Sequence, residues 1–339
     1  MSKNIKSCPN DRLGAVGGQA VLEGVMMKSK EKVALSVRDV HGEIKTEYVE
    51  FSSVIAKHKW LNIPIVRGVV NFVETMALSM KTLNRSADML GIEEEESKFE
   101  KWLTEKLGKS IAAIASVIGT VLGLLLAVGL FFLLPSLIVD LVKNFTDVRI
   151  LLSIVDGTSK ILIFIVYIAL VSLIPDMRRT FEYHGAEHKS IFCHEAGIEL
   201  TPENVKKQSR FHPRCGTSFL FVMMFISIIA SMFYVDLPIQ IRMPIKFLVL
   251  PFIVGIGYEF IKFAGRHNNL FVRILSAPGL WIQRLTTKEP DIQQIEVAIA
   301  SLKAALPGIY PAENTESGVD EASSDKAVDK EGPVNNDNK

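Results

Sequence analysis

Long apolar runs begin at residue 111 and recur over much of the chain that follows. The first, Ile111 to Leu134, contains no charged residue. The later runs are Ile150 to Ile174, Gly216 to Val235 and Phe247 to Phe263. The last of these is interrupted by Pro251 and contains Glu259. Each is close to the length that a helix needs to cross a bilayer. The pattern predicts a mainly α integral membrane protein with about four transmembrane helices between residues 111 and 263.

The segment before the first apolar run has a different pattern. Apolar and polar residues alternate from Lys32 to Phe51, on both sides of His41-Gly42, which predicts two strands joined by a turn. From Pro64 to Leu90 the apolar residues recur at helical spacing, and Phe99 to Leu107 is a second amphipathic stretch. Residues 1–110 are therefore predicted to form a small N-terminal region of a β-hairpin and amphipathic helices.

The end of the chain is predicted to be helical and then disordered. Leu270 to Leu285 combines Trp281 with two arginines, a mixture that is typical of a helix at the membrane interface. Ile292 to Leu306 predicts a further helix, so interfacial and C-terminal helices are expected over residues 264–310. The tail, residues 311–339, is rich in Glu, Asp, Ser and Asn, which predicts disorder.

The basic residues predict how the chain is oriented in the membrane. The connection over residues 175–218 is rich in them, whereas the loops on either side carry two each; the seven in the connection are Arg178, Arg179, Lys189, Lys206, Lys207, Arg210 and Arg214. Short loops rich in Lys and Arg stay in the cytoplasm. We therefore expect a multi-pass protein of the cell membrane with this connection and both termini in the cytoplasm.

Composition excludes several classes of function. Hydrophobic residues make up 48% of the chain, as expected of a membrane protein, and Cys8, Cys193 and Cys215 are too few for a disulfide framework. We therefore expect free or metal-bound thiols. The chain has no phosphate-binding glycine loop and no G-x-S-x-G motif. Its basic residues are not interleaved with aromatic ones, so no nucleic-acid partner is expected, and membrane lipids are the predicted partner.

The strongest chemical signal is the segment "YHGAEHKSIFCHE". His184, Glu187 and His188 fit H-x-x-E-H, in which two histidines one helical turn apart bind a metal and the glutamate activates water. "RFHPRCG" brings His212 and Cys215 back to the same membrane face, where either one would complete the three protein ligands of a catalytic zinc site. The alternative is a set of surface histidines that contact lipid head groups, and the sequence leaves the choice between His212 and Cys215 open.

Two further polar clusters are candidates for the same site. Glu23 lies in "GAVGGQAVLEGVMM", a segment apolar enough to be buried, so its carboxylate needs a partner. The candidates are the metal, Arg67 and Arg214, and we place Glu23 beside Glu187 as a candidate catalytic carboxylate; the alternative is a strand with a bulge whose Glu23 faces water. The second cluster is Glu259 with His267, although an ion pair near the membrane surface needs no catalytic role.

Several of these segments occur together in one family. "GGQAVLEGVMM", "IPIVRGV", "YHGAEHKSIFCHEAG", "HPRCGTSF" and "EPDIQQIEVAIASL" resemble the bacterial YqhQ-like family of unknown function, over about Gly14 to Leu306. Members are described as predicted metal-dependent membrane enzymes, so the resemblance implies a metal site but no substrate. The motifs include the following residues: Gly17, Gly18, Gln19, Glu23, Arg67, His184, Glu187, His188, His212, Arg214 and Cys215.

Three functions fit these observations. The first is a membrane-embedded, metal-dependent hydrolase with zinc at the cytoplasmic membrane surface and Glu187 as its base. The second is a non-catalytic membrane scaffold or assembly factor, in which four protein ligands close a structural metal site. The third is a transporter, suggested by Asp156, Lys160 and Glu259 within the apolar runs. The oligomeric state is left open.

Overall fold

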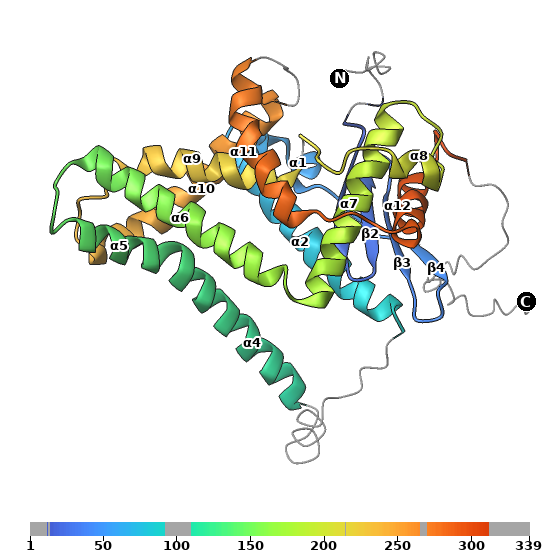
Figure 1. Ribbon diagram of the computed structural model, residues 1–339, viewed down its shortest axis with the longest axis horizontal. Helices are drawn as coiled ribbons and strands as arrows, with labels where there is room; N and C mark the ends of the chain where they lie inside the picture. The colour runs from blue at the N-terminus through green and yellow to red at the C-terminus, as the bar shows by residue number, and fades with distance from the viewer. Residues whose placement is uncertain (1–11, 13, 92–109, 214, 265–269, 312–339) are drawn as a thin grey trace, which may run out of the picture.

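The computed structural model describes residues 12, 14–91, 110–213, 215–264 and 270–311, which form a layered region and a helical arm. Figure 1 shows the layered region on the right, with both described ends of the chain in it, and the arm extending to the left. Several predictions lie outside the described residues, among them the amphipathic stretch Phe99 to Leu107, the tail from residue 312 and the thiol of Cys8.

A four-stranded antiparallel sheet lies at the centre of the layered region. Its strands follow the chain in the order β1-β2-β3-β4, and their bounds are Val16–Val21, Gly24–Ser29, Val33–Arg38 and Ile44–Tyr48. The predicted hairpin forms β3 and β4. For the segment that forms β1 and β2 the sequence offered only one strand with a bulge, as an alternative; the structure shows two paired strands that turn at Leu22-Glu23.

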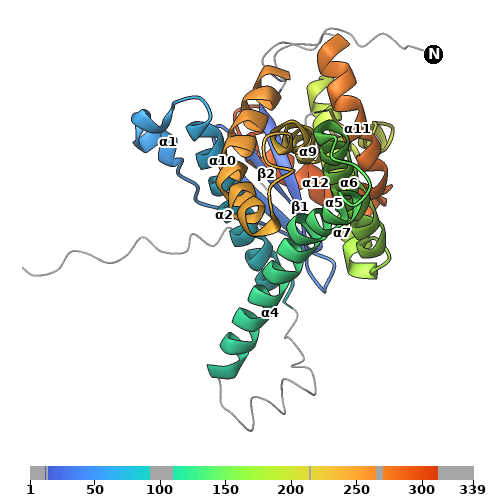
Figure 2. The same cartoon turned by 90° about the vertical axis from the view of Figure 1, so that its left-hand side faces the viewer.

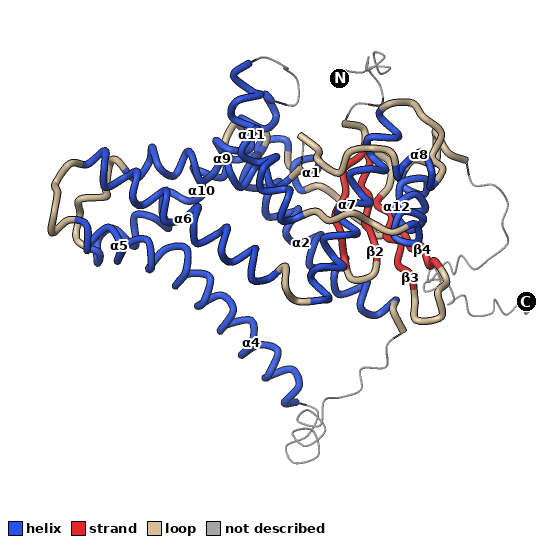
Figure 3. The backbone as a smooth tube through the Cα atoms, viewed as in Figure 1, coloured by secondary structure: helices blue, strands red, loops and turns tan. Residues whose placement is uncertain are grey.

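Helices cover both faces of the sheet. Helix α7 (Pro175–Glu195) lies against β1 and α12 (Ile292–Ala305) against β2 and β3, whereas α2 (Val66–Met89) packs on the opposite face. Figure 3 shows the strands between these helices. Strand side chains alternate between the two cores: Met27 and Ala34 pack with α7 and α12, whereas Leu35 packs with α2. The predicted helices at 64–90 and 292–306 thus cover the sheet.

Local signals fix where these helices begin. Pro175 occupies the first turn of α7, where its missing N–H costs no hydrogen bond. Asp291 caps α12 in a capping box with Gln294. Shorter helices complete the region: α1 (Val54–Lys57), η1 (Lys59–Leu61) and α8 (Pro202–Lys206).

The arm contains the apolar helices. Helix α4 (Ser110–Val128) continues through a π turn, η2 (Gly129–Leu133), into α5 (Leu134–Val142), and the other helices are α6 (Arg149–Val171), α9 (Gly216–Ser231), α10 (Ile239–Ala264) and α11 (Leu270–Thr286). Among the described residues, three stretches are long and apolar enough to cross a membrane: Ile118–Val142, Arg149–Val171 and Ile239–Phe263. The described part of the chain is therefore mainly helical, with three candidate membrane-spanning helices.

Two of the predicted spans differ in extent from the observed helices. The third ends early because the chain turns after Ser231, which leaves an apolar helix of Phe219–Ser231 that is shorter than the three candidates. The fourth begins at Ile239 rather than Phe247, because Arg242 and Lys246 pair with Asp140 and Asp156, which lets the helix include both charges. The prediction started this helix too late because it assigned the two basic residues to the preceding loop.

The two helical hairpins of the arm turn at the same end. Arg149 forms an ion pair of 2.7 Å with Asp236, and Lys143 Nζ donates to the carbonyl of Leu237 over 3.3 Å, so the α5–α6 turn contacts the α9–α10 turn. Figure 1 shows both turns at the far left, opposite the sheet. Figure 2, which looks along the arm from this end, shows α5, α6, α9 and α10 gathered in front of the layered region.

A buried ion-pair network joins α5, α6 and α10 inside the arm. Asp156 is 1% exposed and accepts from Lys160 Nζ over 2.6 Å and from Lys246 Nζ over 2.9 Å. Lys246 also donates to Ser136 Oγ over 2.7 Å, and Arg242 pairs with Asp140 over 2.7 Å. Asp156 and Lys160, two of the three charges that suggested a transporter, therefore bind each other, and Asp156 also binds Lys246 of α10.

A tight helix crossing attaches the arm to the layered region. Helices α2 and α10 meet where Gly68 faces Gly255, and a Cβ atom on Gly68 would lie 2.9 Å from the Gly255 Cα atom. Beside this crossing Arg67 forms a two-pronged ion pair with Glu259. Arg67 and Glu259, both predicted as site candidates, thus bind each other.

Candidate metal centre

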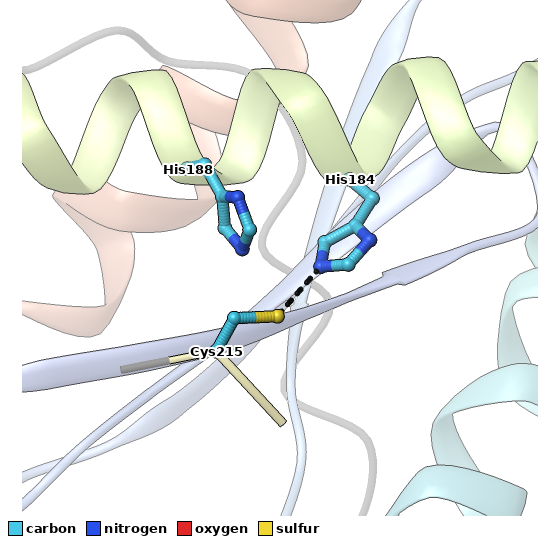
Figure 4. Close-up of side chains that lie close together, drawn as sticks. All are labelled: His184, His188 and Cys215. Carbon is cyan, nitrogen blue, oxygen red and sulfur yellow. Dashed lines mark hydrogen bonds between the residues drawn. The ribbon is translucent and has the colours of Figure 1, made fainter. Parts of the chain in front are cut away.

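Helix α7 and the start of α9 bring three ligand side chains together. His184 and His188 lie one turn apart, so both rings project from the same face of α7, with their centroids 4.4 Å apart. Cys215 is the N-cap residue of α9, and its Sγ atom lies 3.3 Å from His184 Nε2. The ligand atoms of these three residues all lie within 4.8 Å of one another. Figure 4 shows the two rings and the sulfur converging on one point.

Backbone carbonyls determine which nitrogen of each ring is available. His184 Nδ1 lies 2.9 Å from the carbonyl oxygen of Thr286, and His188 Nδ1 lies 2.6 Å from that of Arg210. Because a carbonyl only accepts a hydrogen bond, each Nδ1 atom carries the proton and each Nε2 atom presents a lone pair. Metal-binding histidines are oriented by this same second hydrogen bond. The three side chains therefore fit a zinc ion, which prefers nitrogen and sulfur ligands.

Glu187 lies beside this group in a buried position. Its Oε2 atom is 3.9 Å from His184 Nε2, and the residue is 5% exposed. Burial raises the pKa of its carboxyl group, against the opposing effects of His184 and of the Gly18 N–H. A Cβ atom on Gly18 would lie 2.8 Å from Glu187 Cγ, so glycine lets β1 approach the carboxylate. This contact explains the second glycine of the Gly-Gly pair.

His212 faces a different partner. Its Nε2 atom lies 3.5 Å from Glu195 Oε2, and Glu195 Oε1 accepts from the Gly14 N–H over 3.1 Å. The His212 ring remains close to the group, with its centroid 5.6 Å from that of His188, and Gln283 holds its backbone through two hydrogen bonds of 2.7 Å. Of the two residues left open by the sequence, Cys215 therefore has the ligand geometry and His212 is a neighbour.

Glu23 binds a partner that the sequence did not suggest. It lies in the β1–β2 turn with a φ of 47°, forms an ion pair with Arg179 of α7, and accepts from the Tyr183 hydroxyl over 3.2 Å. Neither the metal group nor Arg67 is its partner, so the expectation of a carboxylate shared with the metal is corrected. Arg179 had been read only as a topology signal. Two other predicted candidates, Arg214 and His267, lie outside the described residues.

The end of α11 and the segment that follows it pack against α7 next to the metal-ligand group. The Lys288 N–H donates to the carbonyl of Phe181 over 2.8 Å, and a Cβ atom on Gly185 would lie 2.0 Å from the Lys288 oxygen. Gly185 therefore allows this segment to lie directly on α7, where Thr286 reaches His184. Sequence reasoning could not have found the Thr286 and Arg210 contacts, because both are made by backbone carbonyls.

A cavity of about 850 Å³ opens in front of the metal-ligand group. Residues 14–20, which include most of β1, form one wall, and His184, Glu187, His188 and Cys215 line the cavity beside it. Apolar side chains from α2 and α9 also line it, namely Phe72, Met76, Phe219 and Leu220, together with polar ones that include Lys28, Lys30, Thr75 and Thr180. The volume lies within the range of substrate-binding sites.

Fold and site together define a protein with three candidate membrane-spanning helices in its described residues, a layered α/β region, and a His/His/Cys group that could hold a metal beside a cavity. The chain belongs to the family described as "Protein of unknown function (DUF1385)", which matches residues 63–308. It is 33% identical, over 299 residues, to "Uncharacterized protein YqhQ" of Bacillus subtilis (strain 168), a match that covers 86% of this chain and 92% of that protein. No solved structure matches it significantly.

Proposed function

We propose that the protein is a membrane-embedded, zinc-dependent hydrolase. The observation that carries this proposal is the contact of His184 Nδ1 and His188 Nδ1 with backbone carbonyls. These contacts leave both Nε2 atoms free to bind a metal on the side of Cys215. Three protein ligands leave one position of a tetrahedral zinc site open, and zinc held in this way lowers the pKa of a bound water to about 7.

The protein's own groups supply the rest of the chemistry. Glu187 is the proposed general base, because its buried carboxylate lies beside the open side of the ligand group. A raised pKa suits this role, since a base works best when its pKa is close to the operating pH. Gly18 positions the carboxylate by donating its N–H, and the apolar walls of the cavity limit the entry of bulk water.

A metal-binding scaffold is the alternative, and His212 is the observation that favours it. Its ring is buried close to His188, so a change of side-chain rotamer would bring a fourth protein ligand toward the group. A fully protein-ligated zinc has no position for water and serves structure only. The two proposals therefore differ in the fourth ligand.

Thiol labelling tests whether Cys215 binds the metal. We expect Cys215 to react with N-ethylmaleimide only after a chelator has removed the zinc, because the metal-bound thiolate is protected. Cys193 is the internal control: it is fully buried, and burial raises its pKa to about 11, so it should react only after unfolding. Site-resolved mass spectrometry measures both thiols. Equal labelling of Cys215 before and after chelation would contradict the proposal.

We also propose that the layered region and both termini lie in the cytoplasm. The support is the seven basic residues between α6 and α9, together with the position of both helical-hairpin turns at the opposite end of the arm. A cysteine introduced at Asn144, in one of these turns, should react with a membrane-impermeant maleimide in intact cells. One introduced at Lys207 should react only after permeabilisation. Both positions are exposed, and the reverse pattern would overturn the orientation.

A further inference from the structure

One edge of the sheet faces the cavity that contains the metal-ligand group. Within the described residues the sheet order is β1-β2-β3-β4, so β1 pairs with β2 alone. Residues 14–20 line the cavity together with His184 and Glu187. The same cavity thus combines a strand edge with the proposed reaction centre.

The backbone groups of β1 point into this space at alternate residues. The Gly18 N–H reaches the Glu187 carboxylate, so it points away from β2. Backbone N–H and C=O groups of an antiparallel strand alternate in direction, so those of Val16 and Ala20 point the same way as those of Gly18. The Gly18 N–H is bonded to Glu187, so an added strand would pair with the N–H groups of Val16 and Ala20 and with the outward carbonyl groups.

The β1 edge lacks the features with which proteins protect a free edge. Its sequence, VGGQAV, contains neither charge nor proline. The opposite edge strand, β4, is protected by Lys45 and Glu47, which form ion pairs with Asp39 and Arg85. A Cβ atom on Gly17 would have no atom within 4 Å, so at this residue the face of β1 toward α2 is open to the cavity. An unprotected edge at a candidate active site indicates a binding surface.

The cavity walls suit the two faces of an extended peptide. Phe72 and Met76 line it from α2, on one side of the sheet, and Ile191 lines it from α7, on the other side. Side chains of a strand added to β1 would alternate between the apolar side chains of α2 and the α7 wall, which also carries His184, Glu187 and His188. A fatty acyl chain could use the apolar side chains but would not pair with the outward backbone groups of Val16 and Ala20.

We propose that β1 binds an extended polypeptide as an added strand and presents it to the metal-ligand group. This inference rests on the proposed function and names its substrate as a peptide bond. Glu187 connects the two, because its carboxylate contacts both Gly18 of β1 and His184. In the hydrolysis, water adds its hydroxyl to the carbonyl carbon, the C–N bond breaks, and the second proton of water goes to the departing amine. No further reactant is needed.

Binding of β-casein, an unfolded polypeptide, tests the inference in the detergent-purified full chain. Glu187→Gln serves as the background so that bound chain is not cleaved, and fluorescence anisotropy measures the affinity. Adding Ala20→Pro removes one outward N–H and should weaken binding about tenfold, the order expected for one backbone hydrogen bond. Ala20→Val is the matched control, since it has a similar side-chain size and keeps the N–H. Equal binding by the proline and valine variants would overturn the strand pairing.

A second measurement does not depend on changes in β1. Casein fragments retained by the Glu187→Gln protein are identified by mass spectrometry, and one is synthesised with each backbone amide N-methylated in turn. Strand addition predicts that alternate positions lose binding while those between them tolerate the methyl group. Uniform tolerance at every position would overturn the inference even if the Ala20→Pro protein failed to fold.

The remaining outcomes separate the inference from the proposed function. A zinc-containing protein that ignores casein but hydrolyses phosphatidylglycerol in mixed micelles would remain a hydrolase and overturn the peptide substrate. A dimer that becomes a monomer on Ala20→Pro, with casein binding unchanged, would make a second copy the partner of β1 and also overturn it. A metal-free protein that binds casein through the β1 edge would support peptide binding by β1 and would contradict the proposal that the protein is a zinc-dependent hydrolase.

Discussion

Replacing Glu187 by glutamine should abolish turnover while zinc content and folding stay close to those of the wild type. Glutamine keeps the size of the side chain and can still accept from the Gly18 N–H, but it cannot take a proton from water. Loss of a general base typically lowers the rate by a factor of about 10² to 10⁴. Complementation of a deletion strain provides the readout, and Glu203→Gln, on the exposed surface of α8, is the control.

A neighbouring substitution separates catalysis from metal binding. His188→Ala should remove a ligand, so zinc content and thermal stability should fall together. If Glu187→Gln complements fully while His188→Ala fails, the base role is wrong and the scaffold becomes the better account.

Asp156→Asn should cause the largest loss of stability in the arm. The substitution leaves the buried Lys246 and the partly buried Lys160 without their shared counter-charge, although the volume of the side chain is preserved. Breaking a buried ion pair by removing one partner typically costs about 3–5 kcal/mol. Thermal unfolding in detergent measures the effect. Asp147→Asn, in the exposed α5–α6 turn, is the control and should change little.

A second substitution tests the cause of this loss. Lys246→Met in the Asp156→Asn background removes one of the two unpaired charges, so it should recover part of the lost stability. No change with Asp156→Asn, or a further loss with Lys246→Met, would show that the network does not hold α6 against α10.

The sequence predicted those helices and strands whose apolar residues all face one neighbouring surface. Residues 64–90 and 292–306 form amphipathic helices because each buries one face against the sheet, and the four-residue spacing of His184 and His188 places both rings together on any helix. Alternation likewise predicted β3 and β4. These features are local, so the chain itself specifies them.

Features that depend on distant partners were missed or left open. The boundary of α10 depends on Asp140 and Asp156, which lie on other helices. The partner of Glu23 is Arg179, more than 150 residues away, and no local pattern connects the two. The choice between Cys215 and His212 depends on how the chain enters α9, where Cys215 takes the N-cap position. Such pairings arise only when the helices pack.

Zinc K-edge X-ray absorption of the detergent-purified wild-type protein tests the central claim most directly. The account predicts one zinc per chain, bound by two imidazole nitrogens and one oxygen at about 2.0 Å and by one sulfur at about 2.3 Å. The oxygen is the sign of an open, catalytic position. A protein that is metal-free after gentle purification and takes up no divalent metal on titration, or a zinc signal without sulfur, would contradict the assignment of His184, His188 and Cys215.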